Sequence, residues 1–159
     1  MRVRLSFIVG MLLASAALGG CGASMIPNTD VEDTSANREV VEFVERYRLA
    51  LEARDVGLLL RLASPQYFDD NGTPTGDDDI DFDGLRDKLA AFPDNLLAVR
   101  YEIRYRRVTF RRDEVAVDYT YTGSFRVVTA SGDRWARRLA DNRLVLRREG
   151  DELRIVSGM

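Results

Sequence analysis

The sequence contains no histidine and only one cysteine among its 159 residues. Without a second cysteine no intramolecular disulfide can form, so the fold must be stabilised by its apolar core. Without histidine the chain lacks the commonest general acid and base of enzymes. These two absences exclude disulfide-stapled scaffolds and every catalytic pair that requires an imidazole.

The amino terminus has the three parts of an export signal. Arg2 and Arg4 precede an apolar run over residues 5–18, and small residues follow that run. A membrane-spanning helix needs about 20 apolar residues, and this run is shorter. We therefore predict a cleaved signal peptide over residues 1–20.

The only cysteine, Cys21, directly follows Leu18-Gly19-Gly20. This tetrapeptide resembles the lipobox of bacterial lipoproteins, which has a leucine three residues before the cysteine and small residues between. The resemblance implies cleavage before Cys21, a diacylglyceryl thioether on its sulfur and an acyl chain on the new amino group. Three chains would anchor the protein in a membrane permanently, because a single chain binds only reversibly. The alternatives are an ordinary signal peptide and a buried helix that happens to carry a cysteine.

The residue after the cysteine bears on sorting between membranes. Enterobacterial lipoproteins with an aspartate there are retained in the inner membrane, and this chain has Gly22. The resemblance therefore implies an outer-membrane lipoprotein that faces the periplasm. Residues 21–34 have little apolar periodicity, which predicts a flexible tether. Residues 35–159 then provide enough chain for one domain.

Apolar residues recur at intervals of three and four from residue 35 onward, which predicts an amphipathic helix. They are Val40, Val41, Phe43, Val44, Tyr47, Ala50 and Leu51. Thr34 or Ser35 is a suitable N-cap for this helix. A second helix is predicted over 56–63, where Asp55 can cap the start. Its leucines lie nearly all round the axis, which is typical of a buried helix.

An acidic segment separates the second predicted helix from the third. Residues 69–83 contain seven aspartates together with turn-forming residues. A loop of this length in a compact domain is functional or mobile. We expect the third helix over 84–92, with Asp81 or Asp83 as its N-cap.

Part of this segment resembles a calcium-binding loop. The residues that match positions 1, 3, 5 and 6 of an EF-hand are Asp79, Asp81, Asp83 and Gly84. Position 12 is Ala90, where an EF-hand requires a bidentate glutamate. The favoured interpretation is a solvated acidic loop that ends in a helix cap, and calcium binding through residues 77–84 is the alternative.

The second half of the chain has the period of β-strands. Apolar residues alternate with arginines and other polar residues over 100–106, 115–127, 134–148 and 153–157. Period two on one face predicts an antiparallel sheet with one covered face. Three helices followed by four antiparallel strands indicate the α+β class.

Two segments resemble the nuclear transport factor 2-like fold, which is also called cystatin-like and includes the SnoaL-like proteins. One is 41–55, a helix that ends in the Arg54-Asp55 pair before the second helix, and the other is the closing hairpin over 142–158. The resemblance implies a cone over residues 35–159, in which three helices pack on a curved four-stranded sheet around an apolar pocket. It specifies the fold better than the function, because the superfamily includes isomerases, cyclases, dehydratases and proteins without catalysis.

Inward-facing residues of the expected sheet are candidates for the lining of that pocket. Tyr119 and Tyr121 point inward because the valines before them fix the phase of their strand, although core packing is an alternative role for both. For the next strand, either of two alternating sets of residues could face inward. One set contains Asn142 and Arg138, and the other contains Trp135. A β-bulge would mix the two sets.

The resemblance also offers an enzymatic alternative. Ketosteroid isomerase-like members use an inward carboxylate as base and a tyrosine as hydrogen-bond donor in a desolvated pocket. The candidates here are Asp69 or Asp118 as base and Tyr119 or Tyr121 as donor. Strand alternation puts Asp118 on the opposite face from the tyrosines, and Asp69 adjoins a polar loop. The His-Asp pair of the dehydratases is absent.

Charge is divided unevenly along the chain. Residues 21–94 carry 17 acidic and 7 basic side chains, whereas residues 95–159 carry 9 acidic and 14 basic ones. We therefore expect acidic helices and an arginine-rich sheet face, either as a solvated surface or as a platform for an anionic partner or a second copy of the chain. An acidic envelope protein is not expected to bind nucleic acid.

The favoured interpretation is a lipid-anchored envelope protein whose cone is a non-catalytic module for a small apolar ligand or a protein. The membrane is the expected partner of the lipid, and a second copy is the expected partner of the arginine-rich sheet. The sequence indicates no cofactor. The enzyme and the calcium-binding protein are the two alternatives.

Overall fold

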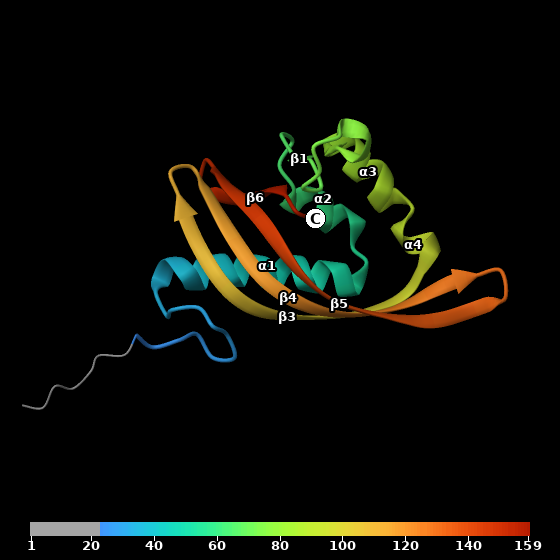
Figure 1. Cartoon of the computed structure of the whole chain (residues 1–159), viewed down its shortest axis with the longest axis horizontal. Coiled ribbons are helices and arrows are strands. Elements are labelled where there is room, and N and C mark those ends of the chain that lie inside the picture. Colours follow the sequence, from blue (N-terminus) through green and yellow to red (C-terminus); the bar gives the residue numbers. More distant parts are fainter. Residues whose placement is uncertain (1–22) are drawn as a thin grey trace, which may run out of the picture.

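The computed structural model describes residues 23–159, which form a curved sheet with helices packed against it (Figure 1). The predicted signal peptide and Cys21 lie outside the described residues. The helices are α1 (Ser35–Ala53), α2 (Val56–Leu62), α3 (Phe82–Ala90) and α4 (Phe92–Asn95). The long strands are β3 (Leu96–Arg111), β4 (Glu114–Thr129), β5 (Gly132–Glu149) and β6 (Glu152–Ser157). Between α2 and α3 lie β1 (Phe68–Asp69), the 3-10 helix η1 (Gly76–Asp78) and β2 (Ile80–Asp81).

The long strands form one antiparallel sheet in the order β3-β4-β5-β6, as the sequence predicted. The pairing of β4 with β5 runs without a register shift over both strands, all of whose residues are described. A single phase therefore holds along β5, and the two faces of this strand are not mixed. Asn142 lies opposite Tyr119 and shares its face, whereas Trp135, an odd number of residues away, lies on the other face.

Helix α1 supplies the helical side of the core. Its buried residues are Asn37, Val40, Val41, Phe43, Val44, Tyr47 and Ala50. They pack with buried strand residues that include Val117, Leu144, Leu146 and Ile155. Helix α2 contributes Leu59 and Leu62, while Leu58 and Leu60 are only half-buried. The expectation that α2 is buried nearly all round was therefore wrong, because one of its sides faces outward.

Side chains of α1 cover the outer edge of β3. The Tyr101 backbone N–H donates to Glu52 Oε1 at 2.8 Å, and Arg48 Nη1 donates to the Tyr101 carbonyl at 3.3 Å. Arg54, in the left-handed conformation at the end of α1, donates to the Leu96 carbonyl at 2.8 Å. An uncovered edge strand invites pairing with other chains, and these polar contacts occupy part of that edge.

Residues 24–33 also pack on β3 and do not form the flexible tether that the sequence predicted over 21–34. The loop closes on itself through the Ile26 N–H to the Val31 carbonyl at 2.9 Å, and Val31 is only 3% exposed. The Asp30 N–H donates to the Tyr105 carbonyl at 3.0 Å. Apolar periodicity could not reveal this packing, because the loop contributes only one buried valine and is otherwise held by backbone hydrogen bonds. Every buried core residue lies between Val31 and Val156, so a chain beginning at Gly22 retains the described core.

The helix starts agree with the predicted caps. The Thr34 side chain accepts from the Asn37 N–H at 3.1 Å, and the Asp55 side chain accepts from the Leu58 N–H at 2.8 Å. The third helix begins at Phe82, two residues before the predicted start, because Asp81 is its cap. None of the helices described in residues 23–159 is long and apolar enough to cross a membrane.

Candidate functional site

The helix-facing side of the sheet is filled by tyrosines. Tyr101 and Tyr105 come from β3, Tyr119 and Tyr121 from β4, and Tyr47 reaches them from α1. The Tyr101 and Tyr121 rings stack with centroids 4.8 Å apart, and Tyr119 is 1% exposed. Tyr121 is half-buried. The inward direction predicted for Tyr119 and Tyr121 thus leads into a packed aromatic cluster.

Hydrogen bonds fix the Tyr119 hydroxyl at the centre of this cluster. Asn142 Nδ2 donates to the Tyr119 oxygen at 2.8 Å and to the Gly158 carbonyl at 3.0 Å. Burial raises the pKa of Tyr119, while hydrogen bonds from Asn142, Tyr101 and Tyr47 partly offset that rise. Burial also raises the pKa of Tyr47 and that of Tyr101. The cluster therefore favours neutral phenols that bond to one another.

The Asp69 carboxylate holds the carboxyl-terminal residues. Its Oδ2 accepts from the Gly158 N–H at 2.8 Å and from the Tyr67 hydroxyl at 3.1 Å, and its Oδ1 accepts from the Asn71 N–H at 3.0 Å. Tyr67 in turn accepts from the Met159 N–H at 3.1 Å. Two predicted site residues, Asp69 and Asn142, therefore belong to one network, but they meet through Gly158.

The remaining pocket candidates lie at the margin or outside. Trp135 is 50% exposed on the outer face, where the Arg100 guanidinium lies 5.3 Å from the centre of its ring. Its prediction as a pocket residue was wrong, because the unbroken register of β5 turns it away from Asn142. Arg138 shares the face of Asn142 but is exposed, opposite Gly123. Asp118 lies on the outer face and accepts from Arg143 Nε at 2.6 Å.

The aspartates of the calcium-like segment have different roles in the fold. Asp81 Oδ1 accepts from the Gly84 N–H at 2.8 Å and so caps α3, and Asp83 pairs with Arg86 at 2.8 Å. Asp79 precedes the short strand β2. In the part of the chain that the structure describes, no group of three side chains is placed to hold a metal ion. The helix replaces the loop geometry that an EF-hand needs.

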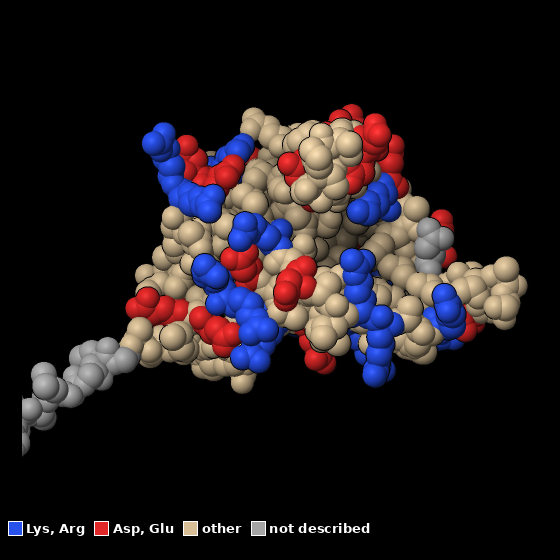
Figure 2. Space-filling view, in the orientation of Figure 1, with Lys and Arg blue, Asp and Glu red and all other residues tan. Residues whose placement is uncertain are grey.

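Ion pairs cross much of the surface that the sequence predicted to be arginine-rich. Figure 2 shows carboxylates gathered around α3 and arginines spread over the strands, with carboxylates between them. The arginines with a carboxylate partner include Arg104 and Arg106 with Asp30, Arg126 with Asp133, and Arg143 with Asp118. Arg104 and Arg106 lower the pKa of Asp30. The outer face thus carries arginines and carboxylates in ion pairs, together with arginines such as Arg137 that have no ion-pair partner among residues 23–159.

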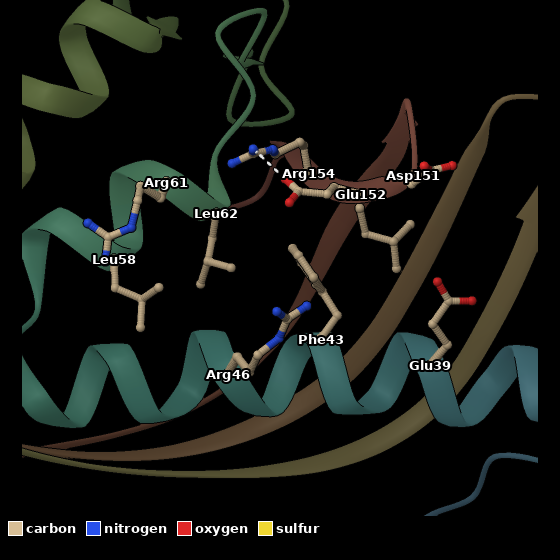
Figure 3. Close-up of a pocket in the computed structure, with 10 residues that line it drawn as sticks. Glu39, Phe43, Arg46, Leu58, Arg61, Leu62, Asp151, Glu152 and Arg154 are labelled. Atoms are coloured by element: carbon tan, nitrogen blue, oxygen red, sulfur yellow. Dashed lines mark hydrogen bonds and ion pairs between the residues drawn. The ribbon is translucent and has the colours of Figure 1, made fainter.

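A groove of about 470 Å³ lies between α1, α2 and β6, outside the tyrosine cluster (Figure 3). Phe43, Leu62 and Leu153 provide buried apolar side chains along it. Arg46 and Arg61 lie beside these residues. Sequence reasoning missed this site, because its residues come from three segments that only the tertiary fold brings together.

Comparison with known proteins identifies the fold. No family model and no curated protein matches the sequence. A proposed scytalone dehydratase from Novosphingobium aromaticivorans gives a TM-score of 0.66 at 9% identity, covering 77% of this chain and 80% of that one. A proposed dehydratase of the NTF2-like family from Streptomyces avermitilis gives 0.61 at 16% identity, over 77% and 92%. Aln2 from another Streptomyces species gives 0.61 at 18% identity, over 81% and 91%.

At such low identity the likeness shows the fold alone. The chain has the α+β, nuclear transport factor 2-like cone that the sequence predicted, with its helices packed on a four-stranded antiparallel sheet.

Proposed function

With the nuclear transport factor 2-like cone as the premise, we propose that this chain is a lipid-anchored envelope protein and that its cone is a non-catalytic binding module. One observation carries the second part: the polar groups that an enzyme of this fold would use are already bonded within the protein. Tyr119 is 1% exposed and its oxygen is bonded to Asn142.

The bonded state of Asp69 argues against the enzymatic alternative. A catalytic carboxylate in this fold needs a desolvated position beside substrate and a free lone pair for the proton. Asp69 accepts three hydrogen bonds, among them one from the Gly158 N–H that holds the chain end, and these occupy most of its roughly four lone-pair positions. The chain also has no histidine, which removes the His-Asp pair of the dehydratases.

The lipid anchor is supported by the Leu18-Gly19-Gly20-Cys21 sequence, with outer-membrane sorting supported by Gly22. The packed loop at 24–33 adds a geometric consequence. Only two residues lie between Cys21 and Ser24, whose carbonyl accepts from the Asp33 N–H. At about 3.5 Å per residue, the fold would begin within roughly 10 Å of the lipid.

The anchor is tested by metabolic labelling with an alkyne-bearing fatty acid. The unaltered protein should take up the label, and Cys21→Ser should not. A matched control, Cys21→Ser combined with Ser24→Cys, keeps one thiol nearby and should also remain unlabelled. Label on Cys21→Ser, or on the control, would contradict attachment at the lipobox.

The non-catalytic role is tested by complementation of a deletion strain in growth competition. Tyr119→Phe removes only a hydroxyl from the buried cluster, so the variant should restore fitness as fully as the unaltered gene. A folded Tyr119→Phe protein that behaves like the deletion would favour the enzyme, because a donor hydroxyl would then be essential.

The homodimer through the outer sheet face remains a prediction, and exposed Trp135 and Leu139 are the apolar residues that would support it.

A further inference from the structure

The groove between α1, α2 and β6 has the size of a ligand site, and its lining combines four apolar residues with six charged ones. Its volume of about 470 Å³ is within the usual range for small-molecule pockets, roughly 300–1,000 Å³. Figure 3 shows Leu62 directed from α2 and Phe43 from α1 into the space between the two helices. The tyrosine cluster lies on the sheet side of the core, so this groove is a separate site.

Three arginines and three carboxylates line the groove, and ion pairs occupy only part of this set. Glu39 is paired with Arg148 at 2.5 Å, and Glu152 is paired with Arg154 at 2.6 Å. Arg46 and Arg61 have no carboxylate within ion-pair distance in residues 23–159, although both are exposed at the groove. Two guanidinium groups are therefore available to an anion.

The unpaired arginines lie away from the acidic end of the groove. In Figure 3 Arg61 lies at the left on α2 and Arg46 extends from α1 to the middle of the view beside Phe43, whereas Glu39 and Asp151 lie on the right. The Arg46 guanidinium is 5.2 Å from the centre of the Phe43 ring, so this cation adjoins the apolar lining directly. A ligand with an anionic end and an apolar body matches this order of charge and apolar surface.

We propose that the groove binds a single-chain anionic amphiphile. Arg46 and Arg61 hold its carboxylate or phosphate head, and its chain lies along Phe43, Leu62 and Leu153. Guanidinium groups suit both heads, because they donate paired hydrogen bonds to carboxylate and to phosphate oxygens. The inference rests on the proposed function as a binding module and gives that module a class of ligand.

Isothermal titration of the chain beginning at Gly22 tests the chemistry of this ligand. The probes are decanoate, decyl phosphate and decanol, each below its micelle-forming concentration. One or both anions should bind at least tenfold more tightly than decanol, and whichever anion binds best identifies the head group. Octanoate should bind about 15-fold more weakly than decanoate, because it lacks two methylenes and each buried methylene contributes about fourfold in affinity.

Paired substitutions locate the site. Arg46→Gln and Arg61→Gln should each weaken binding of the preferred anion by about tenfold and leave decanol unchanged, because a charge-assisted hydrogen bond is lost. Arg86→Gln is the matched control, since Arg86 is also an exposed helical arginine but lies on α3, away from the groove. Unchanged melting temperatures establish that the variants fold.

Three results would overturn the proposal: no binding of either anion, equal binding of decanoate and decanol, or full affinity in both Arg46→Gln and Arg61→Gln. Failure here leaves fatty-acid labelling of Cys21 and complementation by Tyr119→Phe unaffected. Failure of those two experiments would likewise leave the groove titration unaffected, so the two proposals are separable.

Discussion

Asn142 and Gly158 together connect the aromatic interior to the end of the chain. Asn142 bonds to both the Tyr119 oxygen and the Gly158 carbonyl, and the Gly158 N–H bonds to Asp69. Gly158 has φ of 95°, and a Cβ there would collide with the carbonyl of Arg143. Glycine is thus required at this point, and the last residues serve the fold through polar contacts as well as through strand pairing.

Asn142→Ala should lower the free energy of unfolding by about 1–3 kcal/mol, because two partly buried partners lose their donor. Urea denaturation measures the change. Arg137→Ala is the matched control on the same strand, since Arg137 is exposed and has no ion-pair partner among residues 23–159. It should change stability by less than about 0.5 kcal/mol. Equal effects of the two substitutions would contradict the role given to Asn142.

The tyrosine cluster predicts a loss of stability in alkali. Burial raises the pKa of Tyr47, Tyr67, Tyr101, Tyr105 and Tyr119 above 10 in the folded state. As pH rises through about 10, the unfolded chain releases phenolic protons that the folded chain retains, so the unfolded state is favoured. Each such tyrosine lowers stability by about 1.4 kcal/mol per pH unit in that range.

Absorbance at the phenolate band should therefore rise in one cooperative step that coincides with loss of the far-ultraviolet circular dichroism signal. Below that step stability should be insensitive to these phenols. Smooth ionisation of most tyrosines near pH 10 in a protein that is still folded would contradict the packed interior.

At the start of α3, Asp81 is either a helix cap or a calcium ligand, and substitutions distinguish the two roles. Asp81→Ala removes the bond to the Gly84 N–H and should destabilise the domain by about 1 kcal/mol. Asp81→Asn retains a side-chain oxygen and should recover most of the loss. Thermal melts with and without calcium should coincide for all three proteins. A calcium-dependent shift that Asp81→Ala abolishes would restore the metal site.

Elements with a sustained period could be predicted from sequence, and short or tertiary features could not. Alternation fixed the direction of Tyr119 because two valines precede it on the same face. The sequence did not determine which face of β5 carries Trp135, because small, charged and apolar residues occur in both alternating sets around it. Only the pairing with β4 decides this. The loop anchored by Val31 and the groove lined by Leu62 and Leu153 depend on contacts between distant segments.

For the whole molecule, the packed amino-terminal loop determines how the cone would meet the membrane. Asp30 joins this loop to Arg104 and Arg106, so the described chain begins on the β3 side of the sheet. A lipid on Cys21 would hold the domain close to the bilayer without a long spacer. Such a position suits a module that receives an amphiphile from the membrane surface.

A lipid on Cys21 is proposed to hold the cone at the membrane. Intact-mass spectrometry of the protein extracted from its native membrane detects such a lipid directly. The expected mass is that of residues 21–159 plus a diacylglyceryl group and one further acyl chain. The mass of the unmodified 159-residue chain, or of a cleaved chain without lipid, would contradict it.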